Sequence, residues 1–296
     1  MCNFWRSLNT LLVSDDYDIN TDYSMKNKTI IITGAAQGFG AGIARELFAQ
    51  GANIVLADIK EEAGNELAAG LNESKQQNRA IFLACDVAAY DSVSAMIETV
   101  ARELGWIDIL VSNAGILYAG SLEEMDTDTF ELVTKVNYTG YFNCVKAVSP
   151  FMKKQHEEDP HRFMDIIQIN SKSGLKGSLK NFAYAGGKFG GIGLTQSFAL
   201  ELMPYNIKVN SICPGNYFEG PLWADLETGL FRQYLDTGKV PGAKTIDDVK
   251  RHYEKQVPAG RGCRVEDVVK AINYVVDQEY ETGQAIPVSG GQIMLK

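Results

Sequence analysis

The chain predicts an α/β fold in which one doubly wound parallel sheet forms a single domain. Apolar runs rich in β-branched residues alternate with amphipathic helical patterns from Ile30 to Val276, as in sheets covered by helices on both faces. In such sheets, ligands lie beyond the carboxyl ends of the strands. Glycine or polar motifs follow most of these ends, so one shared crevice is expected. The expected strands are 29–33, 53–57, 80–84, 108–112, 164–169, 207–212 and 285–288.

The first expected strand leads through a glycine-rich turn into a helix. The turn contains Gly34, Gly38 and Gly40, with Gln37 and Phe39 around the second glycine. Glycines permit a tight turn and a close approach to a pyrophosphate, and a helix start offers unpaired N–H groups at the positive end of its dipole. The turn is therefore a candidate site for a dinucleotide.

The second expected strand ends in an acid, Asp58, eighteen residues after Gly40. Its carboxylate can accept hydrogen bonds from both ribose hydroxyls of a dinucleotide and would repel a 2′-phosphate. Neither Gln37 nor Ile59 offers a cation for such a phosphate. The sequence thus predicts NAD as the cofactor rather than its phosphorylated form.

A catalytic pattern follows the fifth expected strand. Ser171 precedes Tyr184 by thirteen residues, and Lys188 comes four residues after the tyrosine. Residues four apart lie on the same face of a helix. The lysine charge is expected to lower the pKa of the phenol from its usual value of about 10, which would make Tyr184 an acid/base near neutral pH.

Taken together, these motifs resemble the short-chain dehydrogenase/reductase family from about Lys28 to the C-terminus. The resemblance implies a Rossmann fold, with Asn137 completing a catalytic set of Asn137, Ser171, Tyr184 and Lys188. By the same resemblance, Asp86 and Val87 border the adenine, Pro214 and Gly215 cover the nicotinamide, and Asn137 fixes a water beside Lys188. The implied cofactor contacts are Gly34, Gln37, Gly38, Phe39, Gly40, Asp58, Ile59, Asp86, Val87, Asn113, Ala114, Gly115, Tyr184, Lys188, Pro214, Gly215, Asn216 and Tyr217.

A narrower resemblance concerns the substrate. The segments 168–174, 188–191, 262–263 and 290–292 are similar to those of sorbitol-6-phosphate 2-dehydrogenases. This implies a polyol or polyol phosphate and its ketose as the small-molecule pair. Two alternatives stay open, a 3-oxoacyl reductase and a non-catalytic NAD-binding protein. Asp58 argues against the first, since such reductases usually take the phosphorylated cofactor, and the complete catalytic set argues against the second.

The stretch 216–257, here called the lid segment, is long for a connection, and such excursions usually form lids or binding loops. Within it, Glu219 stands where many family members have a threonine that holds the carboxamide of the nicotinamide. Asn216 or a backbone group is then expected to substitute.

The expected substrate contacts are Ser171, Lys172, Lys180 and Asn216. An ammonium group directly after the catalytic serine would attract an anionic substrate, so Lys172, with Lys180, is a candidate to bind a phosphate. The alternative is a lysine that is solvated or paired with a nearby acid.

Composition restricts the partners. A net charge of −9 disfavours nucleic acid and anionic membranes, and no apolar run reaches the length of about 20 residues that spans a bilayer. Five scattered cysteines, an odd number, indicate reduced thiols and a cytoplasmic location. The three histidines lack metal-ligand spacing, so no metal is expected, and two of them, His156 and His161, lie in an expected solvated loop at 153–162.

Residues 1–24 are expected to form an extension before a domain at 25–296, either flexible or packed on a neighbouring subunit. The family resemblance implies a homotetramer that pairs through helices near 127–154 and 183–203. Phe182, Phe189 and Phe198 would either be buried in that interface or belong to the core of the monomer.

Overall fold

A seven-stranded, fully parallel sheet forms the centre of the molecule, in the order β3-β2-β1-β4-β5-β6-β7. The structure, a computed structural model, describes residues 25–294 except 75, 228 and 237, so the expected extension at 1–24 lies outside the described residues. The predicted doubly wound Rossmann domain is confirmed. The strands are β1 (Thr29–Thr33), β2 (Asn53–Asp58), β3 (Ala80–Ala84), β4 (Ile109–Ser112), β5 (Met164–Ile169), β6 (Ile207–Pro214) and β7 (Ala285–Val288).

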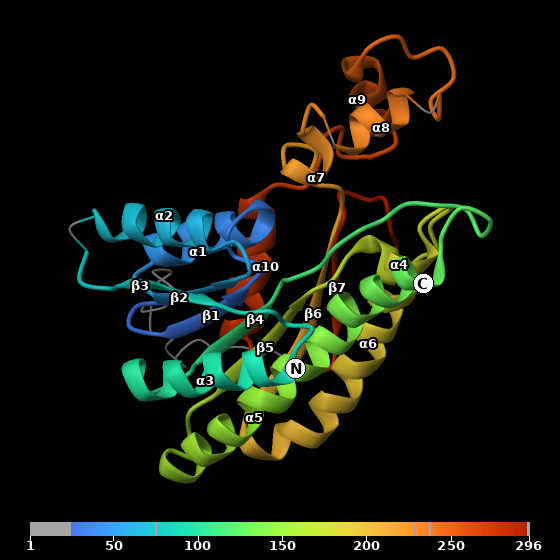
Figure 1. Ribbon diagram of the computed structural model, residues 1–296. Helices are drawn as coiled ribbons and strands as arrows, with labels where there is room; N and C mark the ends of the chain where they lie inside the picture. Colours follow the sequence, from blue (N-terminus) through green and yellow to red (C-terminus); the bar gives the residue numbers. More distant parts are fainter. Residues whose placement is uncertain (1–24, 75, 228, 237, 295–296) are drawn as a thin grey trace, which may run out of the picture.

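Helices cover both faces of this sheet (Figure 1). Side chains alternate between the two faces along each strand. Ile30 and Ile32 accordingly pack in the core under α1, α2 and α10, whereas Ile31 packs in the core under α3, α5 and α6. The helices that form these two layers are α1 (Gly38–Ala49), α2 (Glu61–Asn72) and α10 (Val265–Asp277) on one face, and α3 (Tyr90–Leu104), α5 (Gly140–Glu158) and α6 (Phe182–Leu202) on the other.

The lid segment stands away from the carboxyl end of the sheet (Figure 1). It carries three short helices, α7 (Pro221–Ala224), α8 (Leu230–Asp236) and α9 (Ile246–Lys255). Phe218, Trp223 and Phe231 form the centre of a separate hydrophobic cluster in this segment. Its role as a substrate lid stays a prediction.

The helix expected near 127–154 is interrupted. A π-helical turn at Lys135–Thr139 joins α4 (Thr127–Thr134) to α5. Because α5 continues to Glu158, the prediction of a solvated loop at 153–162 is wrong in its first half. His156 lies in the last turn of α5 with its ring edge-on to Tyr205, and this packing favours the longer helix.

The three phenylalanines of α6 differ in their surroundings. Phe198 packs against the ring of Tyr141, at a centroid distance of 5.7 Å, in the monomer's own core. Phe182 stacks on Phe130 at 6.3 Å. Phe189 is 47% exposed, so it is the one of the three that is most available to another surface.

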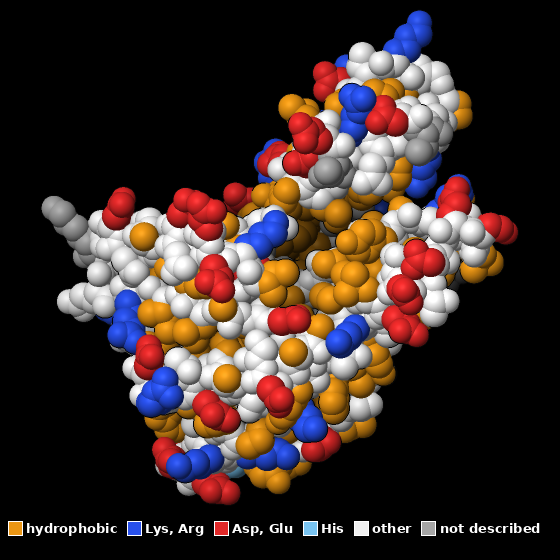
Figure 2. All heavy atoms as spheres, in the orientation of Figure 1, with side chains coloured by type: hydrophobic (Ala, Val, Ile, Leu, Met, Phe, Trp, Pro, Cys, Tyr) orange, Lys and Arg blue, Asp and Glu red, His pale blue; other side chains and the backbone are white. Residues whose placement is uncertain are grey.

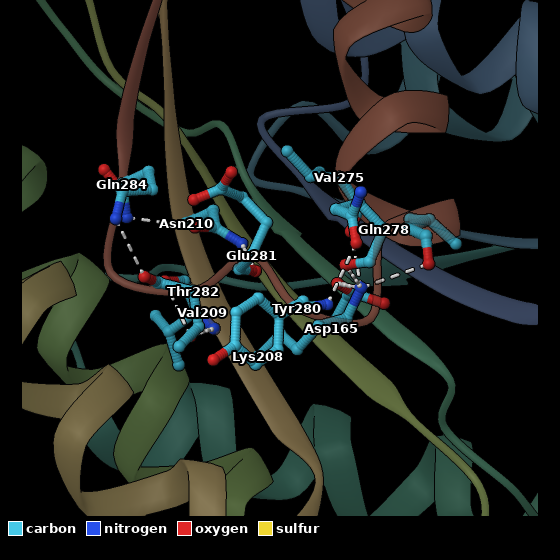
Figure 3. A network of polar contacts seen from close by, with 11 residues as sticks. Asp165, Lys208, Val209, Asn210, Val275, Gln278, Tyr280, Glu281, Thr282 and Gln284 are labelled. Carbon is cyan, nitrogen blue, oxygen red and sulfur yellow. Dashed lines mark hydrogen bonds and ion pairs between the residues drawn. The ribbon is translucent and has the colours of Figure 1, made fainter. Parts of the chain in front are cut away.

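A buried lysine joins the amino end of β6 to the end of α10 (Figure 3). The ammonium of Lys208 donates to the backbone carbonyls of Val275, Val276 and Gln278, and it lies 3.2 Å from the carboxylate of Asp165 on β5. Burial raises the pKa of Asp165 to about 7, and the nearby lysine opposes that rise. Lys208 thus links β5, β6 and α10 at the amino end of the sheet. The glycine and polar motifs lie at the opposite, carboxyl end.

Candidate active site

The glycine turn has the backbone shape that a pyrophosphate requires. Gly34 and Gly38 adopt positive φ angles of 64° and 58°, which favour glycine. A Cβ added at Gly40 would lie 2.1 Å from the carbonyl oxygen of Gly34, so only glycine fits there. Within the described residues, Gln37 gives the start of α1 no side-chain cap, and its N–H groups stay available to a phosphate. These residues fit the phosphates of a dinucleotide.

Asp58 lies at the end of β2 beside this turn and is 8% exposed. Its carboxylate accepts hydrogen bonds from the N–H groups of Ala36, at 2.9 Å, and Lys60, at 3.0 Å. Asp58 thus positions the turn as well as presenting charge. Sequence reasoning missed Lys60, whose ammonium donates to the side chain of Gln37 at 2.7 Å. The position of Lys60, a basic residue two positions after Asp58 at the end of the strand, could have indicated this contact.

The loop after β4 passes between the glycine turn and Asn137. The side chain of Asn113 donates to the carbonyls of Thr33 and Gly34, each at 3.0 Å. A Cβ at Gly34 would lie 2.7 Å from Cα of Ala114, and one at Gly115 would lie 3.2 Å from Oδ1 of Asn137. Residues 113–115 therefore link the expected cofactor turn to the expected catalytic asparagine.

The residues after β3 occupy the neighbouring strand end. Asp86 is exposed and accepts a hydrogen bond from the N–H of Ala88 at 2.9 Å. Val87 is buried, and its carbonyl accepts from the side chain of Asn143. Ile59, at the end of the adjacent strand, is 70% exposed. These three residues line the outer part of the same edge.

Tyr184, Lys188 and Ser171 come together at the carboxyl end of β5. The ammonium of Lys188 lies 5.5 Å from the centre of the Tyr184 ring and donates to the carbonyl of Ile169 at 2.8 Å. Burial lowers the pKa of Lys188 to about 8. The expectation that Lys188 lowers the pKa of Tyr184 is not met here, because burial raises that pKa while a hydrogen bond with Ser171 opposes the rise.

Asn137 lies within the π-helical turn, a distortion that often marks functional sites. Its side-chain amide makes two hydrogen bonds to one residue. Oδ1 accepts from the N–H of Ile116 and Nδ2 donates to the carbonyl of Ile116, both at 2.8 Å. The expected role of Asn137 in holding a water beside Lys188 stays a prediction.

The segment after β6 contacts the glycine turn directly. The Tyr217 ring stacks on Phe39 with a centroid distance of 4.4 Å and an interplanar angle of 18°. Gly215 donates to the carbonyl of Val288, which fixes the turn after Pro214. The backbone carbonyl of Asn216 accepts a hydrogen bond from the N–H of Cys263, which joins this segment to the residues before α10.

Glu219 has an exposed side chain that pairs with a basic residue. Its side chain is 62% exposed and lies 3.9 Å from the guanidinium of Arg264. The expectation that Asn216 or a backbone group substitutes for the threonine of the family stays a prediction.

The two expected phosphate ligands have different environments. Lys180 lies 3.6 Å from the carboxylate of Glu124, and the two side chains are 50% and 62% exposed. Lys172 is half-buried, and no carboxylate in the described part of the chain pairs with it. Burial and the charge of Lys176 lower the pKa of Lys172.

A hollow lies between the lid segment and the body of the molecule, and hydrophobic side chains gather around it (Figure 2). Among the described residues, no group of three or more histidine, cysteine or acidic side chains could hold a metal ion. No helix within those residues is long and apolar enough to cross a membrane.

Comparisons with known proteins agree with this geometry. The short chain dehydrogenase family matches residues 28–228. Sorbitol-6-phosphate 2-dehydrogenase of Escherichia coli is 34% identical over 270 residues, which are 90% of this chain and 99% of that protein. The 3-oxoacyl-[acyl-carrier-protein] reductase of Chlamydia muridarum is 32% identical over 268 residues, covering 90% of this chain and 97% of that protein.

A solved structure gives the same answer. The crystal structure of sorbitol-6-phosphate 2-dehydrogenase from Erwinia amylovora superposes with a TM-score of 0.82 at 34% identity, covering 90% of this chain and all of that one. The chain therefore belongs to the short-chain dehydrogenase/reductase family and is an oxidoreductase that acts on CH–OH groups.

Proposed function

We propose that this enzyme interconverts a polyol phosphate and its ketose with NAD. The observation that carries the substrate class is the half-buried ammonium of Lys172, next to Ser171 and without a carboxylate partner among the described residues. A partly desolvated cation is costly unless an anion meets it, and a substrate phosphate would supply that anion. The similarity to sorbitol-6-phosphate 2-dehydrogenases supports the same class.

In this proposal Tyr184 carries the proton. Its phenolate takes the proton of the substrate hydroxyl during oxidation, and its phenol returns one during reduction. Ser171 donates a hydrogen bond to the reacting oxygen and stabilises the charge that develops there. Lys188 holds the nicotinamide ribose. Burial raises the pKa of Tyr184, and its hydrogen bond with Ser171 opposes that rise and so favours the phenolate. NAD supplies the hydride acceptor when it is bound.

The choice of NAD rests on Asp58, whose buried charge would oppose a 2′-phosphate. Lys60 lies nearby and could attract that phosphate, but its ammonium is engaged by Gln37. Measurement of kcat/KM with NAD and with NADP tests the proposal. A preference for NADP would contradict it.

The substrate experiment uses two neighbouring lysines. Lys172→Met is expected to raise KM for sorbitol 6-phosphate by about tenfold or more, because it removes one charge-assisted contact. Lys176→Met is the matched control, since Lys176 is exposed one turn away, and it should change that KM little. KM for NAD should be unchanged in both. If the unaltered enzyme used sorbitol and sorbitol 6-phosphate equally well, the phosphate assignment would fail.

The hydrophobic rim of the hollow favours one other candidate, a 3-oxoacyl reductase, because an acyl chain would bury apolar surface there. The similarity to the Chlamydia muridarum reductase supports it as well. Reduction of acetoacetyl-CoA compared with reduction of fructose 6-phosphate, each with NADH, separates the two candidates.

We also propose a cytoplasmic homotetramer that assembles through α4, α5 and α6. Large apolar side chains are exposed on these helices, namely Leu132, Phe142, Phe189 and Leu200 at 45%, 40%, 47% and 83%. Burial of such side chains would favour assembly.

The four described cysteines are free and buried, which fits the reducing compartment proposed for this enzyme. Sedimentation showing only a 32.5 kDa species at micromolar concentration would contradict the tetramer.

A further inference from the structure

The side chain of Asn170 connects two residues of the proposed catalytic set. We propose that Asn170 is a positioning residue that fixes Ser171 and Lys188 relative to each other. The inference rests on the proposed function, because it takes both residues as catalytic.

Three hydrogen bonds carry the inference. Oδ1 of Asn170 accepts from the N–H of Ser171 at 2.8 Å. Nδ2 donates to the backbone carbonyl of Lys188 at 2.9 Å and to Oε1 of Gln168 at 2.7 Å. Asn170 is 4% exposed, so water does not compete freely for these bonds. Both hydrogens of the amide are used, and the side chain therefore has one defined orientation.

Lys188 is consequently held by the end of β5 at two points. Its ammonium donates to the carbonyl of Ile169, and its own carbonyl, in the interior of α6, accepts from Asn170. A backbone carbonyl has two lone pairs, so it can accept this bond in addition to the helical one. Without the Asn170 amide, only the flexible side chain of Lys188 would join this turn of α6 to the end of β5.

A glycine makes room for this contact. A Cβ added at Gly174 would lie 2.2 Å from Oδ1 of Asn170 and 3.0 Å from the carbonyl oxygen of Lys188. No positive φ angle is involved at Gly174, so a side chain there would act through contact alone. Alanine at position 174 should thus displace the Asn170 amide while leaving the asparagine in the sequence.

The other side of the amide is held by a buried network. Oε1 of Gln168 also accepts from the hydroxyl of Ser211 at 2.9 Å. The hydroxyl of Thr195 lies 2.8 Å from that of Ser211 and 3.1 Å from that of Tyr141. Two hydrogen bonds, Gln168–Ser211 and Ser211–Thr195, thus separate Thr195 from the contact between Gln168 and Asn170.

The test compares kcat, KM and the pH profile of four variants with the unaltered enzyme. The assay uses sorbitol 6-phosphate with NAD, or acetoacetyl-CoA with NADH if that is the activity found. Asn170→Ala and Gly174→Ala should each lower kcat by about 100-fold, since a displacement of about 1 Å at a reacting group can cost that much. KM should change much less. NADH binding, followed by fluorescence, should weaken less than kcat falls.

Asn170→Asp adds a readout that lost stability cannot imitate. The carboxylate keeps an acceptor for the N–H of Ser171 and, when ionised, places negative charge on the residue that follows Ile169, whose carbonyl holds the ammonium of Lys188. Negative charge raises the pKa of both the ammonium and the phenol. In the plot of kcat for alcohol oxidation against pH, the rise that reports loss of the proton from the catalytic group should therefore move to higher pH.

Thr195→Val is the matched control. It removes hydrogen bonds from the same buried network at nearly constant volume, without contact to Ser171 or Lys188. It should lower Tm, because it removes two buried hydrogen bonds, but it should leave kcat far above that of Asn170→Ala. Equal losses of kcat in Asn170→Ala and Thr195→Val, with an unmoved profile in Asn170→Asp, would overturn the positioning role.

Tyr184→Phe is assayed in parallel. If it retains turnover, the proposed catalytic set is wrong and the inference fails with it. If it is inactive while Asn170→Ala keeps its kcat, only the role of Asn170 is refuted.

Discussion

Lys188→Met should separate the catalytic use of this lysine from its effect on stability. Burial lowers the pKa of Lys188 from 10.5 to about 8, so the folded protein holds this ammonium less readily than the unfolded chain does. At about 1.4 kcal/mol per pKa unit, the charged form costs about 3 kcal/mol of stability at pH 7. Methionine removes that cost but leaves the carbonyl of Ile169 without its partner, a loss of about 1–3 kcal/mol. The inactive variant should therefore be as stable as the unaltered enzyme at pH 7, or up to about 2 kcal/mol more stable.

The pH dependence gives the sharper result. Between pH 8 and 10.5 the unfolded chain binds the proton of Lys188 and the folded protein has released it, so stability rises with pH in this window. Lys188→Met lacks that rise, and its advantage over the unaltered enzyme should shrink by about 3 kcal/mol from pH 8 to 10.5. Urea unfolding of both proteins at equal concentration measures the difference while other titrations cancel. A difference that stays constant from pH 7 to 10.5 would refute the reasoning.

Three further results are expected. Tyr184→Phe should abolish turnover while NADH binding survives, as measured by activity and by fluorescence titration, because the change removes a proton carrier and leaves the glycine turn intact. Asp58→Asn should raise the kcat/KM ratio of NADP to NAD by about tenfold or more, since it removes charge but retains an acceptor for the turn; an unchanged ratio would contradict the role of this charge. Gly40→Ala should lower both Tm and NADH affinity, because its Cβ would meet the carbonyl of Gly34 at 2.1 Å and the amide of Asn113 at 2.6 Å; wild-type affinity would show that the turn can adjust.

The strands were predictable because strands of a parallel sheet that is covered on both faces appear in the sequence as short apolar runs, and even the partly exposed edge strands β3 and β7 have such runs. All seven expected strands are present, and the one end that differs by more than one residue is that of β6, which continues through Cys213 to Pro214. The π-helical turn around Asn137 was not predictable, since its side-chain bonds to Ile116 join segments far apart in sequence. The direction of the Tyr184 pKa also depends on burial, which a four-residue spacing does not report.

The small core of the lid segment has a consequence for how this enzyme can evolve. Its buried members lie between Phe218 and Val257, and among the described residues packed against it only Leu117 comes from outside the lid segment. Mutations there can reshape the hollow without removing packing from the two cores of the sheet. Under the prediction that the lid segment shapes the substrate site, substrate preference can change without a change in the residues proposed for hydride transfer. Relatives about one-third identical to this chain include both a polyol phosphate dehydrogenase and an oxoacyl reductase.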